Sequence, residues 1–585
     1  MQPATICGAD PLVRGRRPRR PGFGCGYAAL WGRRFRLPTH RPTITDLPNR
    51  DRKGVGAVAL RLPNRDRKGV GAVALRLPNR DRKGVGAVAL RYRTATVRES
   101  VPLNNAKMIH MRPLLTIALL STLTAANRTP VPAVEEKPHA CTIPGLTKPA
   151  LCATYPVWED RDRKAGRKIG LNIVILPALN PEKAEPVFAF GGGPGEGITE
   201  SAPSYAFFQA IRAHHEIIMI DQRGTGRSNP LDCDFYGNPP DLQRVVNTSF
   251  PVDAVRACRQ RLEKIADLKL YTTAIGMDDI DEVREWLGYD KINLAGGSYG
   301  SLAAQVYLRR HGQHVRAAAL SGIVPPDELH PLHVAWAGQR AVDIIFEKRR
   351  ADAACQAAYP NLQEDFKSIF DHVRKGVEVE VRAPDGRTAR VHPGVEALAE
   401  GIRHYLYSTD GAAFPQLIHR AASGDLAPLI QRAVSAEIEI NSILAMGMLL
   451  SVSCAEQIPY IDDATLAHET ANTFLGDLRV QEQRAACREW VRAPVPKDVH
   501  DLVHSQVPVL LISGARDAVT PPDFGDRVAK QLPNSRHIIF PESSHGNTGF
   551  CGIKLMSDFL EKGTADALDV SCVSQQKPPK FKVDP

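Results

Sequence analysis

Between residues 169 and 321, short runs of apolar residues alternate with longer segments in which apolar positions recur at helical spacing. Several short runs contain no polar position, which is typical of strands buried on both faces of a sheet. The pattern predicts strands at Ile169–Leu176, Pro186–Phe190, Glu216–Ile220, Lys291–Ala295, Val315–Ser321, Val507–Ser513 and Arg536–Phe540. Helices are predicted between them, including Met277–Leu287 and Ser298–His311. This alternation predicts an α/β fold with a mostly parallel sheet.

The alternation stops after Pro325-Pro326 and resumes at Val507. In between, the spacing of apolar residues predicts mostly helices, for example Val334–Arg349, Leu362–Val373 and Leu426–Met448. We therefore expect an α/β core in two parts, residues 140–326 and 506–575, with a mainly helical cap at 327–505. A cap inserted late in the sheet would cover the carboxyl edge, where ligands bind in open α/β folds.

The first 107 residues differ in composition from the rest. Residues 47–91 repeat one 15-residue unit, LPNRDRKGVGAVALR, three times without a change. This segment holds 24 basic and 6 acidic residues, a net charge of +18, so the remainder carries −7 of the total of +11. We expect 1–107 to be a disordered basic leader or a mis-assigned start, the alternative being an arm that binds an anionic surface. Nucleic acid is not an expected partner of the acidic remainder.

Residues 108–126 combine a short basic start, an apolar run of 13 residues and a small-residue exit, Thr124-Ala125-Ala126. These features predict a secretory signal peptide, and the alternative is a buried helix. The run is too short for a membrane span, so export without a stable membrane anchor is expected.

Nine cysteines follow residue 126, and eight form pairs close in sequence, with Cys355 left over. The pairs are 141/152, 233/258, 454/487 and 551/572. In an exported protein such pairs favour disulfides, although their connectivity stays open. No CxxC or Cys/His ligand spacing appears, so we expect neither a metal nor another cofactor.

A G-x-S-x-G motif, Gly296-Gly297-Ser298-Tyr299-Gly300, directly follows a predicted strand and opens a predicted helix. Small flanking residues in a sharp strand–turn–helix would hold Ser298 in a strained conformation with its hydroxyl exposed, as a nucleophile requires. The alternative is a glycine-rich packing turn.

A nucleophilic serine needs a base and an acid that orients it. Asp517 and His545 each come just after one of the last two predicted strands, in the order acid then base that this type of fold uses. Asp523 and Glu542 are nearby alternatives for the acid. Tyr299 would supply one oxyanion-hole N–H, and the loop Gly191–Gly195 would supply the other.

Together the motifs resemble the prolyl and tripeptidyl aminopeptidase family of α/β-hydrolases. They are GGGPG at 191–195, DQRGTGRS at 221–228, GGSYG at 296–300, GARDAVTPP at 514–522 and SSHG at 543–546. The resemblance spans about residues 140–575 and implies metal-free serine peptidases that release residues from peptide N-termini. Carried over by motif, Ser298, Asp517 and His545 form the triad, and Gly193 and Tyr299 form the oxyanion hole.

Two details separate the branches of that family. Prolyl relatives often begin the first motif with His, where this chain has Gly191, and the segment from Cys551 to Cys572 resembles the tripeptidyl branch. In DQRGTGRS, Asp221 and Arg223 are expected to brace the turn.

An exopeptidase of this kind must bind the free α-ammonium of its peptide substrate, and buried cap carboxylates could do so. The candidates are Glu437, Glu439 and Glu456, of which Glu456 is the first choice. A carboxylesterase or lipase is the chief alternative, because the same triad serves both reactions. A non-catalytic binding module is a second, against which the intact triad argues.

Overall fold

The computed structural model describes residues 128–180, 184–206, 208–408, 411–546 and 548–583, with two short pairs at 59–60 and 73–74. Those pairs form β1 (Ala59–Leu60) and β2 (Val73–Ala74), which are antiparallel and belong to a separate unit of residues 32–119. The rest of the predicted leader and the predicted signal peptide lie outside the described residues, so both stay predictions.

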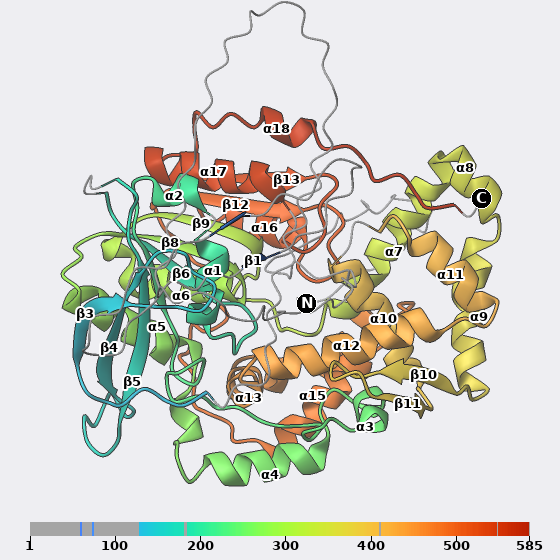
Figure 1. Ribbon diagram of the computed structural model, residues 1–585, viewed down its shortest axis with the longest axis horizontal. Helices are drawn as coiled ribbons and strands as arrows, with labels where there is room; N and C mark the ends of the chain where they lie inside the picture. Colours follow the sequence, from blue (N-terminus) through green and yellow to red (C-terminus); the bar gives the residue numbers. More distant parts are fainter. Residues whose placement is uncertain are drawn as a thin grey trace, which may run out of the picture. The chain divides into compact units, whose positions relative to one another are not determined.

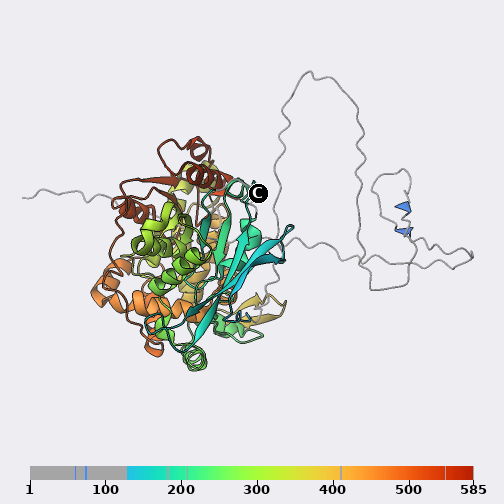
Figure 2. The ribbon, with the colours of Figure 1, turned by 90° about the vertical axis from the view of Figure 1, so that its left-hand side faces the viewer.

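A nine-stranded sheet, ordered β13-β12-β9-β8-β6-β7-β5-β4-β3, forms the core (Figure 1). Its parallel part contains β6 (Val187–Phe190), β7 (Ile217–Ile220), β8 (Ile292–Ser298), β9 (Val315–Ile323), β12 (Val509–Gly514) and β13 (Ser535–Phe540). The antiparallel end contains β3 (Glu136–Cys141), β4 (Ala150–Trp158) and β5 (Lys168–Leu176), in blue to green in Figure 2. All seven predicted strands are present.

Helices cover both faces of the sheet because alternate strand residues point to opposite sides. Phe188 and Leu294 join the hydrophobic cluster of α5 (Thr273–Trp286) and α6 (Tyr299–His311). Their neighbours in sequence, Val187 and Ala295, join a second cluster. It contains residues of α1 (Ala202–Tyr205), α2 (Gln209–Arg212) and α17 (Gly549–Lys562). The burial of both faces explains why the central strands contain so few polar positions.

The cap consists mainly of helices, as predicted, and also contains one hairpin. Its helices are α7 (Val334–Ala351), α8 (Ala353–Ala358), α9 (Leu362–Arg374), α10 (Val395–Ser408), α11 (Phe414–Ala422), α12 (Ala427–Ile443), α13 (Met446–Glu456), α14 (Asp463–Thr470) and α15 (Leu478–Glu489). The hairpin pairs β10 (Val379–Arg382) with β11 (Thr388–Val391). In Figure 1 the cap helices, yellow to orange, lie together on one side of the sheet.

The prediction of one helix over Leu426–Met448 is wrong. The segment forms α12 and α13, separated at Leu444 and Ala445, where the backbone of Leu444 is extended. Leu444 makes an isolated β-bridge to Glu196, and the N–H of Ala445 donates to the carbonyl of Gly195 at 2.9 Å. The N–H of Ala445, which would otherwise have continued the helix, is therefore bonded to a loop of the core.

All four predicted cysteine pairs form disulfides, and Cys355 is a buried free thiol. Across the described parts of the chain, no helix combines the length and the apolar character that a membrane span would need.

Candidate active site

Ser298 stands at the junction between β8 and α6 with φ 57° and ψ −131°, a conformation that few non-glycine residues adopt. The motif glycines make this turn possible. A Cβ on Gly296 would lie 2.3 Å from the carbonyl oxygen of Gly300, and a Cβ on Gly300 would lie 2.5 Å from that of Phe190. Close backbone approach therefore explains both glycines, and the strand–turn–helix predicted around Ser298 is confirmed.

Asp517 and His545 follow β12 and β13, and the structure brings them together. His545 Nδ1 lies 3.1 Å from Asp517 Oδ1, and both side chains are fully buried. The N–H of Arg516 donates to the carbonyl of Ser543 at 2.9 Å, which ties the two loops to each other. Since β8, β12 and β13 run parallel, the loops that carry Ser298, Asp517 and His545 leave the same edge of the sheet.

The protonation preferences of this pair follow from burial. Burial lowers the pKa of His545 well below its ordinary value, and the nearby Arg403 guanidinium lowers it further. Burial raises the pKa of Asp517, while the N–H groups of Val519 and Ala518 oppose the rise. His545 Nε2 is buried without a hydrogen-bond partner among the described residues. A neutral imidazole with an open Nε2 has the form that a general base requires.

The other two acid candidates are placed differently. Glu542 forms an ion pair with Lys348, and Asp523 lies in the first turn of α16 (Pro522–Ala529).

The cap also contacts the histidine, since the ring of Tyr407 in α10 lies 3.7 Å from the ring of His545, centroid to centroid.

The glycine loop after β6 lies against the serine turn, because a Cβ on Gly192 would come within 3.8 Å of Ser298 Cβ. The N–H of Gly192 already donates to Glu196 Oε2 at 2.6 Å, and Gly193 follows with φ 106°. Tyr299 is the first residue of α6, so its N–H has no acceptor within the helix. The sequence analysis missed Glu196, whose carboxylate ties down this loop, and no motif signals it.

Asp221 braces the turn of DQRGTGRS, as expected, because it accepts from the N–H of Arg227 at 3.0 Å. Asp221 is fully buried and accepts from the N–H of Thr199 at 2.9 Å and from Asn172 Nδ2 at 2.8 Å. Arg223 is fully buried too, and its guanidinium holds both oxygens of Asp279 at 2.6 and 2.8 Å.

Two of the three cap carboxylates are occupied by neighbouring side chains. Glu456 accepts from the N–H and the hydroxyl of Thr273, at 2.7 and 2.8 Å. Glu437 accepts from Ser249 at 3.0 Å and from Tyr236 at 3.3 Å.

Glu439 differs from the other two. Its Oε1 is buried without a hydrogen-bond partner among the described residues. Burial raises its pKa to about 8, although the guanidinium of Arg432 opposes the rise. Glu439 lies little more than one helical turn before Leu444, which contacts the glycine loop. Of the two, Glu439 rather than Glu456 therefore has a carboxyl oxygen open to a new partner.

Comparison with known families agrees with this geometry. Residues 185–374 match the family described as "alpha/beta hydrolase fold", and residues 472–572 match the family described as "TAP-like protein". The chain has the α/β-hydrolase fold. The two matches fall on both parts of the core and extend into the cap.

Curated relatives of this α/β-hydrolase include several proteins named as peptidases, and some of them match most of its length. A tripeptidyl aminopeptidase of Streptomyces lividans is 24% identical over 74% of this chain and 85% of its own. The serine protease Hip1 of Mycobacterium tuberculosis is 25% identical over 66% of this chain and 80% of its own. A proline iminopeptidase of Neisseria gonorrhoeae is 29% identical over only 27% of this chain and 37% of its own.

Proposed function

We propose that this α/β-hydrolase is a serine peptidase that releases residues from the free N-termini of peptides. The observation that carries the proposal is the buried Asp517–His545 pair, with an open Nε2, at the sheet edge that also presents the strained Ser298. Relatives named tripeptidyl aminopeptidase and serine protease, matched over 74% and 66% of this chain, support a peptidase, whereas a relative named carboxylesterase B is matched over 36% of it.

The reaction assigns one task to each group. Ser298 Oγ attacks the scissile carbonyl carbon while His545 Nε2 takes the hydroxyl proton, and Asp517 holds the imidazole and stabilises its charged form. The N–H groups of Tyr299 and Gly193 bind the developing oxyanion. His545 then gives the proton to the leaving amine, and an acyl-enzyme remains on Ser298. Water, activated by the same imidazole, hydrolyses this ester and restores the serine.

Recognition of the N-terminus is assigned to Glu439. An α-ammonium next to its unpartnered oxygen would form a charge-assisted hydrogen bond. Because burial makes the lone carboxylate costly to ionise, a cation from the substrate would stabilise it strongly. Glu437 and Glu456 already have partners and would have to give up hydrogen bonds first.

We place this activity outside the cytoplasm. Four disulfides join sequence-near segments of the core and cap, and such bonds persist in oxidising compartments. Recovery of the protein only from the cytoplasmic fraction of the cells that produce it would contradict this assignment.

A substrate panel tests the proposal. It compares chromogenic derivatives of proline, of alanine and of a tripeptide, each with a free N-terminus, with a simple acyl ester. A peptidase of the proposed kind cleaves at least one amide with a kcat/KM above that for the ester. Hydrolysis of the ester alone would favour a carboxylesterase or lipase on the same fold.

A further inference from the structure

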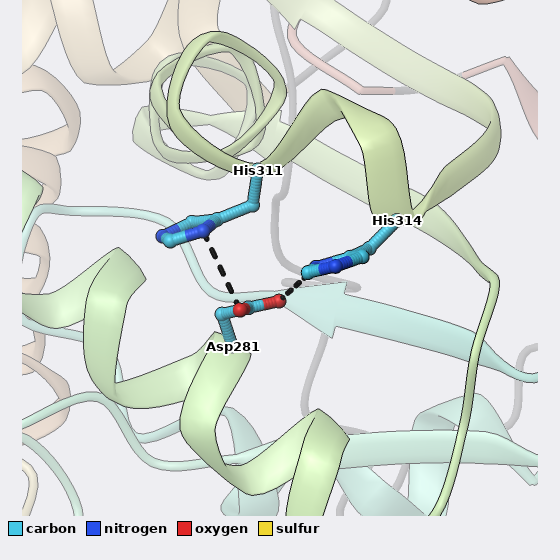
Figure 3. Close-up of side chains that lie close together, drawn as sticks. All are labelled: Asp281, His311 and His314. Atoms are coloured by element: carbon cyan, nitrogen blue, oxygen red, sulfur yellow. Dashed lines mark hydrogen bonds and ion pairs between the residues drawn. The ribbon is translucent and has the colours of Figure 1, made fainter.

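Three side chains that the proposed reaction does not use converge at the end of α6. Asp281 comes from α5, His311 is the last residue of α6, and His314 ends the following short helix η3 (Gly312–His314). One possible ligand atom of each lies within 4.8 Å of the other two. Figure 3 shows both imidazole rings beside the carboxylate of Asp281. We propose that these three side chains bind a divalent transition-metal ion, with Zn²⁺ as the best fit.

The spacing of two of these atoms suits coordination better than hydrogen bonding. His311 Nδ1 lies 3.4 Å from Asp281 Oδ2. Zinc binds nitrogen and carboxylate oxygen at about 2.0–2.2 Å in tetrahedral geometry, which separates neighbouring ligand atoms by roughly 3.3–3.6 Å. An ion bound to Oδ2 and to His311 Nδ1 therefore needs little movement of either side chain.

His314 requires a larger adjustment. Its Nδ1 lies 2.8 Å from Asp281 Oδ1, the distance of a hydrogen bond. Metal binding would replace the Nδ1 proton, which would leave to solvent or reappear on Nε2, as is usual when imidazole becomes a ligand. The side chain of His314 is 25% exposed, so the ring has room to turn and solvent has access to the cluster.

The surrounding hydrogen bonds resemble the outer shell of a metal site. His311 Nε2 lies 2.9 Å from Asp278 Oδ1, and metal-bound histidines usually donate their second N–H to a carboxylate in this way. With that N–H on Nε2, the Nδ1 lone pair of a neutral His311 faces the lone pairs of Asp281 Oδ2. Two acceptors in that arrangement repel each other unless a cation lies between them. The cation is either a proton on His311 or a metal ion.

Arg284 donates to both oxygens of Asp281, from Nε to Oδ1 at 2.7 Å and from Nη2 to Oδ2 at 3.4 Å. A metal ion on Oδ2 would replace the longer of these two hydrogen bonds and leave the shorter one in place. Arg310 pairs with Asp278 rather than with Asp281.

A second cluster with possible ligands, Glu400, His404 and Glu437, is arranged differently. There Arg403 Nη2 lies 2.7 Å from His404 Nε2, the ring nitrogen nearest the two carboxylates. A guanidinium at this position excludes a metal ion, so we assign no metal site to that cluster.

The test uses the full chain without a polyhistidine tag, stripped with a chelator and titrated with ZnCl₂ by isothermal calorimetry. We expect the wild type to bind one Zn²⁺ per chain. The variants His311→Gln and His314→Gln should each lose this binding. Asp278→Asn should weaken binding by about 10–100-fold, the usual effect of losing an outer-shell carboxylate. His419→Gln is the matched control, because His419 Nδ1 pairs with Asp365 at 2.8 Å without a third ligand. It should bind Zn²⁺ like the wild type.

Thermal unfolding with and without ZnCl₂ provides a second readout and shows that each variant folds. Zn²⁺ should raise the Tm of the wild type and of His419→Gln, but not that of the two histidine variants. Failure of the wild type to bind Zn²⁺ would overturn the proposal. Binding of Zn²⁺ by both histidine variants with the affinity of the wild type would overturn it too. The cluster would then be an ion pair between protonated histidine and aspartate. Neither readout depends on peptidase activity.

Discussion

At the residue scale the proposed chemistry depends on Ser298, whose turn holds the side chain in a conformation that the motif glycines make possible. Replacing it with alanine removes the nucleophile and leaves these backbone contacts in place. We expect Ser298→Ala to lower kcat by about 10⁶-fold, the size of effect that loss of a triad nucleophile has elsewhere. Its Tm should stay close to that of the wild type. The exposed Ser204 on α1 provides the control variant Ser204→Ala, which should be fully active. A folded Ser298→Ala protein with most of its activity would remove Ser298 from the mechanism.

The acid can be identified by a pair of matched variants. Asp517 contacts His545 directly, so Asp517→Asn should lower kcat by about 10⁴-fold through the wrong imidazole tautomer. Asp523 lies in a neighbouring helix turn, and Asp523→Asn should change kcat by less than about tenfold. Steady-state kinetics on the best amide substrate measures both. The reverse ranking would mean that Asp523 is the acid.

The raised pKa of Glu439 gives a pH prediction. Below about pH 8 the free enzyme holds this carboxyl mostly protonated, so binding an ammonium requires loss of the proton. The kcat/KM for a free-amine substrate should therefore rise between pH 6 and 8, by up to about tenfold per pH unit. The pKa of His545 is depressed, so its titration adds little in this range.

Dividing the wild-type profile by that of Glu439→Gln cancels the titration of the substrate itself. We expect this ratio to rise with pH, and the ratio for the exposed cap residue variant Glu380→Gln to stay flat. A flat ratio for Glu439→Gln would show that Glu439 does not bind the amine, while leaving the triad intact.

At the scale of elements, the break between α12 and α13 links the cap to the site. Ala445 has φ −71° and Leu444 is extended, so proline fits the backbone at 445 but cannot donate to Gly195. We expect Ala445→Pro to lower kcat by at least about tenfold, because it loosens the glycine loop that carries the oxyanion donor.

The control for this change is Ala353→Pro, at the first position of α8, where proline is tolerated. Both variants are compared by kinetics and thermal melting. Unchanged kcat in a folded Ala445→Pro protein would show that this hydrogen bond has no part in positioning the loop.

The sequence predicted β5 and the six strands of the parallel part, and missed β3, β4 and the hairpin of the cap. Strands β6, β7 and β12 are nearly all apolar, so their pattern was clear, whereas β13 begins with Ser, Arg and His. Strand β3 is exposed, carries Glu, Lys, Pro and His, and pairs only along one edge, so nothing in its pattern marks it. The helix break at Leu444 arises from contacts with Gly195 and Glu196, far away in sequence.

Within the candidate site, the triad residues were easier to predict from the sequence than the residue that would bind the amine. The shared sheet edge of Ser298, Asp517 and His545 could be predicted because each lies at the end of a strand or shortly after it. The first choice for the amine-binding residue, Glu456, has its carboxylate occupied by Thr273, and sequence could not show this because whether a buried glutamate has a partner depends on residues from other elements. Thr273 reaches Glu456 across 183 positions of sequence, for example.

At the scale of the whole molecule, the proposed activity needs a cap that admits a peptide by its N-terminus and excludes one whose end is blocked. The cap approaches the site from two directions, through Tyr407 over His545 and through Leu444 beside the glycine loop. A peptide lying between them would present its first residues to the cap and its scissile bond to Ser298. In the proposed reaction the free ammonium helps to position the scissile carbonyl, so its loss should lower transition-state binding.

The most direct test compares cleavage of one peptide with a free and with an acetylated N-terminus, by mass spectrometry of the products over time. Acetylation removes the positive charge and adds bulk where the cap closes. We predict release of N-terminal residues from the free peptide, and a kcat/KM at least about 100-fold lower for the acetylated one. Equal rates on both peptides, or cleavage at internal bonds, would contradict the proposal that this protein acts on free N-termini.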